Sequence, residues 1–321
     1  MAKRNIKTFV KDKFDYDVSG LDAYIDEQSD EILQALLEDS LFMSRCNIMT
    51  GVKGSEKIKM LASTMVLQSA ATCGWNASGG VVFTDETITN ERLKFQEEYC
   101  NESLNGAWTQ MKNKIGANIQ DLENPFADVI VAYKIKELKR AIQALLINGD
   151  TTSLNPNLAF FDGLRKKLSA DAAVIQVATG ANDFATLLAM SRAIPSEVKS
   201  NMIDHEVLCD MALMQGAIDY VFTNKDFNAL LAWEENEAGE LTFILPTTTT
   251  KFRALPELAG TGEAYAIPYP YVSVAVDGDS DEEGVEVKYN DHDEKLRVGA
   301  KFRLGVQYVF PTYFARLVPA S

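Results

Sequence analysis

The side chains that most often carry out catalysis are few in this sequence and stand far apart. The two histidines are His205 and His292. His205 follows Asp204, and such a pair becomes a hydrolytic triad only where a serine meets the imidazole in space. Because sequence adjacency does not supply that geometry, we interpret the dipeptide as a surface turn. No His/Cys pair has the spacing of a zinc site, so no metal is predicted.

Acidic residues alternate in the late stretch DGDSDEEG, where Asp277, Asp279 and Asp281 match the opening of an EF-hand calcium loop. Glu282 stands where such a loop needs glycine for its turn, and Lys288 stands where it needs a bidentate acid. A calcium loop with both changes would lack its sharp turn and its main ligand. We therefore predict a solvated acidic hairpin turn.

Glycine and cysteine patterns point to no cofactor. Gly260-Thr-Gly262 lacks the third glycine and the following helix of a dinucleotide fingerprint, and the chain has neither a Gly-Lys-Ser/Thr phosphate loop nor a GxSxG elbow. The sequence therefore predicts no catalytic residue and no cofactor-binding residue, and the protein is not expected to be an enzyme. The four cysteines form no CxxC pair, which indicates reduced, partly buried thiols: Cys46, Cys73, Cys100 and Cys209.

Composition indicates an ordinary globular protein. The chain has 321 residues, of which 46% are hydrophobic and 24% are charged. Its net charge of −15 argues against a dedicated nucleic-acid binder. The basic N-terminus has no apolar core of the kind that signal peptides need, and no apolar run reaches membrane-spanning length.

The clearest expected element is a helix between Asn124 and Gly149. Asn124 suits the N-cap, Pro125 suits the first helical position, and Gly149 suits the stop. One face is expected to be an apolar stripe: Val131, Ile135, Leu138, Ile142 and Leu145. Basic residues cover much of the rest of the helix, and this basic face is interpreted either as solvated or as facing DNA: Lys134, Lys136, Lys139 and Arg140. At about 1.5 Å per residue such a helix needs bracing by other elements.

Those other elements alternate between strands and helices. The N-terminal arm is basic with spaced aromatic residues, and is followed by a helix over 29–43. Residues 57–69 and 87–99 are predicted to pair as a long ribbon around the loop CGWNASGGVVF, although 57–69 also fits a helix. Further helices are expected over 101–111, 182–193 and 212–222, and strands over 172–177, 206–211, 242–245, 251–255, 271–276, 285–289 and 295–310. The fold class is α+β.

Three stretches and their order resemble the major capsid proteins of tailed bacteriophages, which have the HK97-like fold. GVKGSEKIKMLAS through ETITNERLKFQEEYC resembles the hairpin of myovirus-like and crAss-like capsid proteins. LPELAGTGEAYAIPYPYVSVAVDG resembles their late segment, and GAKFRLGVQYVFPTYFARL resembles their final strand pair. The long helix ending in LINGD stands between the hairpin and a compact middle, as in that family.

The resemblance implies a structural protein that self-assembles into hexamers and pentamers of an icosahedral shell around double-stranded DNA. The implied parts are an N-terminal arm (1–50), an extended hairpin or E-loop (51–105), a peripheral domain (106–170 and 272–310, with a spine helix over 125–148) and an axial domain (171–271 and 311–321). Implied partners are portal, scaffolding and decoration proteins and weakly held DNA on the inner face, with no membrane. The implied location is the virion, after assembly in the host cytoplasm.

Two other functions stay open at this point. An encapsulin-like nanocompartment has the same fold but encloses enzyme cargo instead of DNA. A cytoplasmic enzyme that uses carboxylates such as Asp277 or Glu283 belongs to a different class.

Overall fold

The computed structural model describes residues 42–65, 79–100, 125–223, 232–235, 241–244, 250–277, 285–290 and 295–318. The helix expected over 101–111 and nearly all of the arm and of the helix expected over 29–43 lie outside these residues. The chain divides into two compact units, one drawn from 1–38, 92–139 and 278–302, the other from 39–91, 140–277 and 303–321. Among the described residues, no helix is long and apolar enough to span a membrane.

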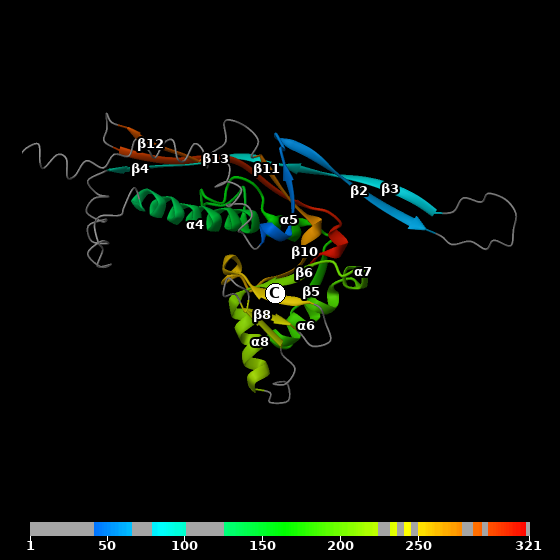
Figure 1. The fold of residues 1–321 in the computed structure, drawn as a ribbon. Coiled ribbons are helices and arrows are strands. Elements are labelled where there is room, and N and C mark those ends of the chain that lie inside the picture. The colour runs from blue at the N-terminus through cyan, green and yellow to red at the C-terminus, as the bar shows by residue number, and fades with distance from the viewer. Residues whose placement is uncertain are drawn as a thin grey trace, which may run out of the picture. The chain divides into compact units, whose positions relative to one another are not determined.

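The long helix is confirmed as α4 (Pro125–Asn148; Figure 1). At its end the Gly149 N–H donates to the Leu145 carbonyl, 2.8 Å away. A side chain at Gly149 would place its Cβ 2.5 Å from the Phe161 carbonyl oxygen, so the helix must end on glycine here. Leu145 and Ile142 of the predicted stripe are buried, which gives this end of α4 its apolar contact. A short helix, α5 (Leu164–Ala170), follows the turn.

The predicted ribbon exists, but its second strand was placed wrongly. Strand β2 (Ser55–Met65) pairs antiparallel with β3 (Gly79–Thr89), so part of the expected loop is strand. Val81 and Phe83 are residue types that favour strands, but the glycines at 79 and 80 directly before them indicated a loop. Residues 91–100 form a separate strand, β4 (Glu91–Cys100), which pairs elsewhere. The helical alternative for 57–69 is wrong over its described part.

A five-stranded sheet holds the strands predicted near the end of the chain. Its order is β1-β11-β13-β12, with β4 also on β13, and its bounds are β1 (Asn47–Thr50), β11 (Val272–Asp277), β12 (Val285–Asn290) and β13 (Lys295–Tyr308). β1 is parallel to β11, whereas β11 and β12 are antiparallel to β13. Every residue of β11 is buried, as expected for a central strand.

A seven-stranded sheet contains the strands predicted in the middle of the chain and several that were missed. Its order is β5-β14-β10-β6-β9-β8-β7. The bounds are β5 (Ile175–Ala178), β6 (His205–Cys209), β7 (Ala232–Glu235), β8 (Leu241–Ile244), β9 (Lys251–Ala254), β10 (Ala264–Pro268) and β14 (Ala315–Val318). β1 of the five-stranded sheet and β7, β10 and β14 of this sheet were not predicted, because strands of four or five residues carry little periodic signal.

Helices α6 (Asp183–Ala193), α7 (Ser196–Ser200) and α8 (Met211–Thr223) accompany the seven-stranded sheet (Figure 1). Asn182 caps α6, because its side chain accepts the Ala185 N–H at 2.8 Å. Apolar residues of α6 and α8, including Leu187 and Met214, share one core with strand residues such as Val207 and Phe252.

Candidate functional site

His205 belongs to the core, which corrects the expectation of a surface turn for this residue, whereas Asp204 before it is exposed. His205 is buried at the start of β6. Its Nδ1 lies 2.7 Å from the Ile203 carbonyl oxygen and its Nε2 lies 3.2 Å from Thr250 Oγ1. The Asp204 carboxylate instead accepts from Arg45 Nε at 2.8 Å. Because the hydroxyl on His205 is that of Thr250 and Asp204 faces away to Arg45, the pair has no triad geometry.

The acidic stretch is described only at its first residue. Asp277 ends β11 and is buried, with Arg303 Nε 3.7 Å from its carboxylate. A buried carboxylate facing a guanidinium is a structural ion pair. The other acidic residues considered above, and the second histidine, lie outside the described residues: Asp279, Asp281, Glu282, Glu283 and His292.

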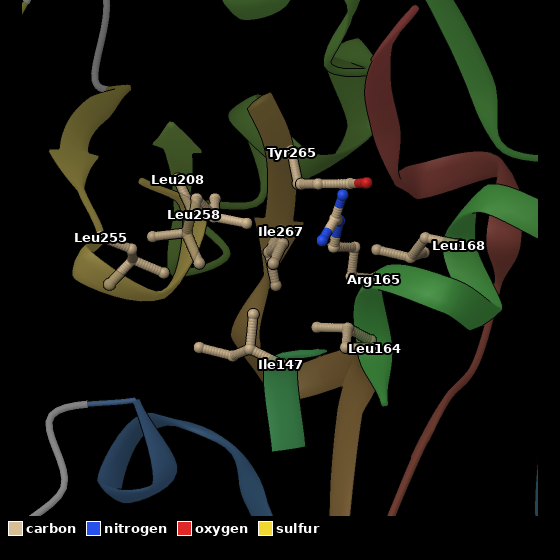
Figure 2. Close-up of a pocket in the computed structure, with 9 residues that line it drawn as sticks. All are labelled: Ile147, Leu164, Arg165, Leu168, Leu208, Leu255, Leu258, Tyr265 and Ile267. Atoms are coloured by element: carbon tan, nitrogen blue, oxygen red, sulfur yellow. The ribbon is translucent and has the colours of Figure 1, made fainter. Parts of the chain in front are cut away.

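One apolar pocket lies between the end of α4, α5 and the seven-stranded sheet (Figure 2). Its cavity volume is about 10 Å³, close to the roughly 10–15 Å³ that a single water needs. Arg165 lies beside Tyr265, and its guanidinium binds Glu263 at 3.1 Å. Burial raises the pKa of Tyr265 to about 12, so its hydroxyl stays protonated and donates to Glu263 at 2.8 Å. The pocket is too small for a substrate.

Metal and thiol chemistry find little support in the described part of the chain. No group of three or more His, Cys, Asp or Glu side chains there is arranged to hold a metal. Cys46 and Cys209 are free and buried, as predicted. Burial raises the pKa of each of these thiols to about 12, so both are protonated and unreactive near neutral pH.

Asp210 organises the Gly260-Thr-Gly262 loop, a role that the sequence reading missed. Its carboxylate accepts the N–H groups of Gly262 at 2.7 Å, Ala212 at 3.1 Å and Gly260 at 3.2 Å. Both glycines have positive φ, 76° and 64°, which L-residues rarely adopt. Burial alone would raise the pKa of Asp210, but these backbone donors lower it below its ordinary value. The available signal was an aspartate directly before an apolar helix.

A partly buried charge cluster joins the segment before β1 to the seven-stranded sheet. Glu206 on β6 is buried and lies 3.2 Å from the guanidinium of Arg253 on β9. The Tyr269 hydroxyl donates to Glu206 at 3.0 Å. Arg45 binds Glu206 and Asp204 and lies 4.1 Å above the Tyr269 ring. The two guanidinium groups and two carboxylates balance in charge; Glu206 and Arg253 are buried, whereas Asp204 is 52% exposed. No local sequence pattern marks this set, because its members come from distant segments.

The hairpin formed by β2 and β3 presents an apolar face to solvent. Leu61 and Phe83 stand directly opposite each other, and Val81 follows two positions along the same face. Their exposed fractions are 58%, 71% and 55%. Single exposed apolar residues are common on proteins, but a contiguous cluster on a two-stranded ribbon indicates an interaction surface.

The opposite face of the hairpin is rooted in its own chain. Ile88 is fully buried against Val52 and Ala275. Asn90 is also buried; its Oδ1 accepts the Gly54 N–H at 2.9 Å, and its amide donates to the Val52 carbonyl. The root therefore holds one end of the ribbon in place, and the face with Leu61 and Phe83 is directed away from it because side chains alternate along a strand.

No protein-family model matches the chain, and no curated protein matches it. Solved structures do. The satellite phage P4 procapsid structure that includes the size determination (Sid) protein is 11% identical, with a TM-score of 0.57 over 90% of this chain and 98% of that chain. The Microbacterium phage Oxtober96 structure is 11% identical, with a TM-score of 0.55 over 88% and 91%.

The virus-like particle from Pyrococcus furiosus is also similar: 10% identical, with a TM-score of 0.50 over 92% of this chain and 99% of that chain. At these identities the likeness concerns the fold. It extends over nearly the whole of each chain, so it is not confined to one common substructure. The chain has the α+β, HK97-like fold of phage capsid proteins, as the resemblance in the sequence predicted.

Proposed function

We propose that this chain is the major capsid protein of a tailed phage, which assembles into hexamers and pentamers of an icosahedral shell around double-stranded DNA. The observation that carries the proposal is the exposed apolar face of the hairpin, on a chain with the capsid fold. An enzyme needs a site that converges on a substrate, whereas a shell subunit needs surfaces that converge on its neighbours. The described residues offer the second kind of feature.

The physics of the hairpin supports self-association. A two-stranded ribbon is marginally stable in water unless it packs on another element. Among the described residues of the hairpin, Ile88 and Ile58 at the root pack on Val52 and Ala275 of the same chain. If a neighbouring copy covered Leu61, Val81 and Phe83, each side chain would contribute up to roughly 1.5–3 kcal/mol to the free energy of association, before the entropy lost on association is subtracted. When such weak contacts are repeated around a shell, their summed free energy of association is large.

The same proposal assigns the expected parts and location. The arm over 1–50 and the hairpin over 51–105 reach neighbouring subunits. Residues 106–170 and 272–310 form the peripheral domain, and residues 171–271 and 311–321 form the axial domain. The chain is found in the virion after assembly in the host cytoplasm. Portal, scaffolding and decoration proteins bind the assembled shell.

Weak contact with the packaged DNA is proposed for the basic face of α4, with a solvated face as the alternative. Lys136 and Arg140 are exposed. Lys134 binds Glu97 at 2.9 Å and Glu137 at 2.7 Å, so its charge is already partly balanced. The net charge of −15 favours a shell that does not hold DNA tightly over its whole surface.

The likeness to the Pyrococcus furiosus virus-like particle favours a second candidate, a nanocompartment shell that encloses protein cargo. Both candidates build closed particles, so particle formation alone does not separate them. Nucleic acid inside particles isolated from the natural host would support the phage shell. Enzyme cargo in place of nucleic acid would support the compartment.

The decisive experiment is expression of the full chain, alone and with its neighbouring gene products, followed by size-exclusion chromatography and negative-stain microscopy. Closed particles of uniform size are expected. A stable monomer with a saturable small-molecule site under both conditions would overturn the proposal in favour of an enzyme.

A further inference from the structure

The turn after α4 is a loop held by its own hydrogen bonds. Its residues from 150 to 162 are linked by many short-range hydrogen bonds. The Asp150 N–H donates to the Leu158 carbonyl at 2.8 Å, and the Asp150 carboxylate accepts from the Thr152 N–H at 2.8 Å. Asp162 accepts from the Thr151 N–H at 2.9 Å. Lys166 on α5 bridges both carboxylates, at 2.6 Å and 2.8 Å. The loop is therefore ordered by its own contacts.

This ordered loop holds a large apolar side chain fully in water. Leu154 is 101% exposed, and Phe160 near the end of the loop is 47% exposed. A flexible loop could fold such residues back onto the protein, but the hydrogen bonds around Asp150 fix this backbone. A preorganised loop that presents leucine loses little conformational entropy when a partner covers it. Leu154 is therefore an exposed apolar side chain on a preorganised loop, which suits it to contact with a partner.

The hairpin face and the loop complement each other in charge as well as in apolar character. Lys57 and Lys59 precede Leu61 on the exposed face of β2, and Asp85 balances one of them at 3.4 Å from Lys57. That rim keeps one net positive charge. In the loop, the two carboxylates share a single lysine and keep one net negative charge. The complementary sign favours docking between these two surfaces over docking of either surface on itself.

We propose that Leu154 of one copy packs against the hairpin face of a second copy, which is formed by Leu61, Val81 and Phe83. Both surfaces are exposed in the single chain, so a second copy can reach them. The contact joins two different patches, which makes it heterologous, and heterologous contacts close into rings when the rotation between copies permits. The inference rests on the proposed function and identifies the surface of the neighbour that receives the hairpin.

Disulfide trapping tests the contact. A Leu154→Cys chain and a Phe83→Cys chain are mixed during assembly, oxidised, and run on a denaturing gel without reductant. Neighbouring thiols at millimolar effective concentration should give roughly tenfold more linked dimer than non-contacting thiols. The wild-type chain gives the background from the native cysteines. Two of these, Cys46 and Cys209, are buried.

Matched variants control for exposure and position. Met202→Cys replaces Leu154→Cys, because Met202 is a similarly exposed apolar residue outside the loop, 89% exposed. Thr87→Cys replaces Phe83→Cys, because it lies on the same exposed face four residues along the strand, about 13 Å away. Pairs that include either control should stay at background.

The outcomes separate the inference from the proposed function. Particles with specific Leu154–Phe83 linkage support both. Particles in which this linkage stays at the level of the controls overturn the docking inference and leave the shell function standing. Absence of particles from the wild-type chain, with no linkage, overturns both.

Discussion

At the scale of single residues, Asp210 is the side chain on which the loop over 259–263 most depends. One carboxylate accepts three backbone N–H groups, two of them from glycines in the left-handed region. The same loop leads into the buried strand β10, so its conformation sets where that strand begins. A local change at Asp210 should therefore affect the stability of the seven-stranded sheet.

Replacing Asp210 with alanine should destabilise the chain by about 2–4 kcal/mol, because buried backbone donors lose their acceptor. The measurement is the midpoint of urea-induced unfolding, monitored by circular dichroism. Asp219→Ala is the control, since Asp219 is an exposed acidic residue on α8, and it should change stability by less than about 0.5 kcal/mol. Equal midpoints for the two variants would contradict the assigned role.

Asp210 also predicts a direction for the pH dependence. Its folded pKa lies below the ordinary value of about 3.9, so the unfolded chain binds this proton more readily. The contribution of Asp210 to stability should be fully present above that ordinary value and should disappear as the pH falls through the lower, folded pKa. Urea titrations of the wild type and of Asp210→Asn should converge on acidification. If the curves of unfolding free energy against pH for the two proteins stay parallel, Asp210 makes no pH-dependent contribution to stability.

At the scale of elements, Arg45 attaches the segment before β1 to β6. Arg45→Met removes the cation that binds Glu206 and Asp204 and should destabilise the chain by about 2–4 kcal/mol, because a buried carboxylate loses a partner. Hydrogen exchange should rise first in residues 43–50 and 205–209. Arg45→Lys keeps the charge and should show a smaller effect. Unchanged hydrogen exchange in both variants would show that the charge cluster does not stabilise the fold.

Close backbone approach gives the second prediction at this scale. A Cβ at Gly305 on β13 would lie 2.1 Å from the Thr89 carbonyl oxygen, at the root of the hairpin. Gly305→Ala should therefore destabilise by several kcal/mol, about 3 or more, or shift the root. Gly80→Ala is the matched control, because a Cβ there meets no atom within 4 Å. Thermal unfolding of both variants measures the difference, and equal melting temperatures would exclude a tight contact.

At the scale of the whole molecule, the hairpin face separates folding from assembly. Phe83→Asp should leave the folding stability within about 0.5 kcal/mol of the wild type, because Phe83 is 71% exposed in the single chain. Assembly should be lost, because a charge would enter the apolar contact between copies. Light scattering and thermal unfolding measure the two effects. Met202→Asp should assemble normally; if both variants assemble, the hairpin face is not an interface.

The sequence determined those features whose signals are local and repeated. The helix from Pro125 to Asn148 has a proline start, a glycine stop and a long apolar stripe, so its bounds were predicted closely. The long strand β13 and the helices α6 and α8 were likewise readable from periodicity. The order of these elements also sufficed for the resemblance to the capsid fold.

Only the tertiary structure decided which segments meet. The partner of β2 is β3 and not β4, a choice made by the root around Ile88 and Asn90 and not by alternation alone. Arg45 and Glu206 come together from distant parts of the chain, and so do Asp210 and Gly262. Strand alternation and helix caps act over a few residues, whereas charge balance and close packing are satisfied in space. The sequence therefore predicted elements, and folding selected their contacts.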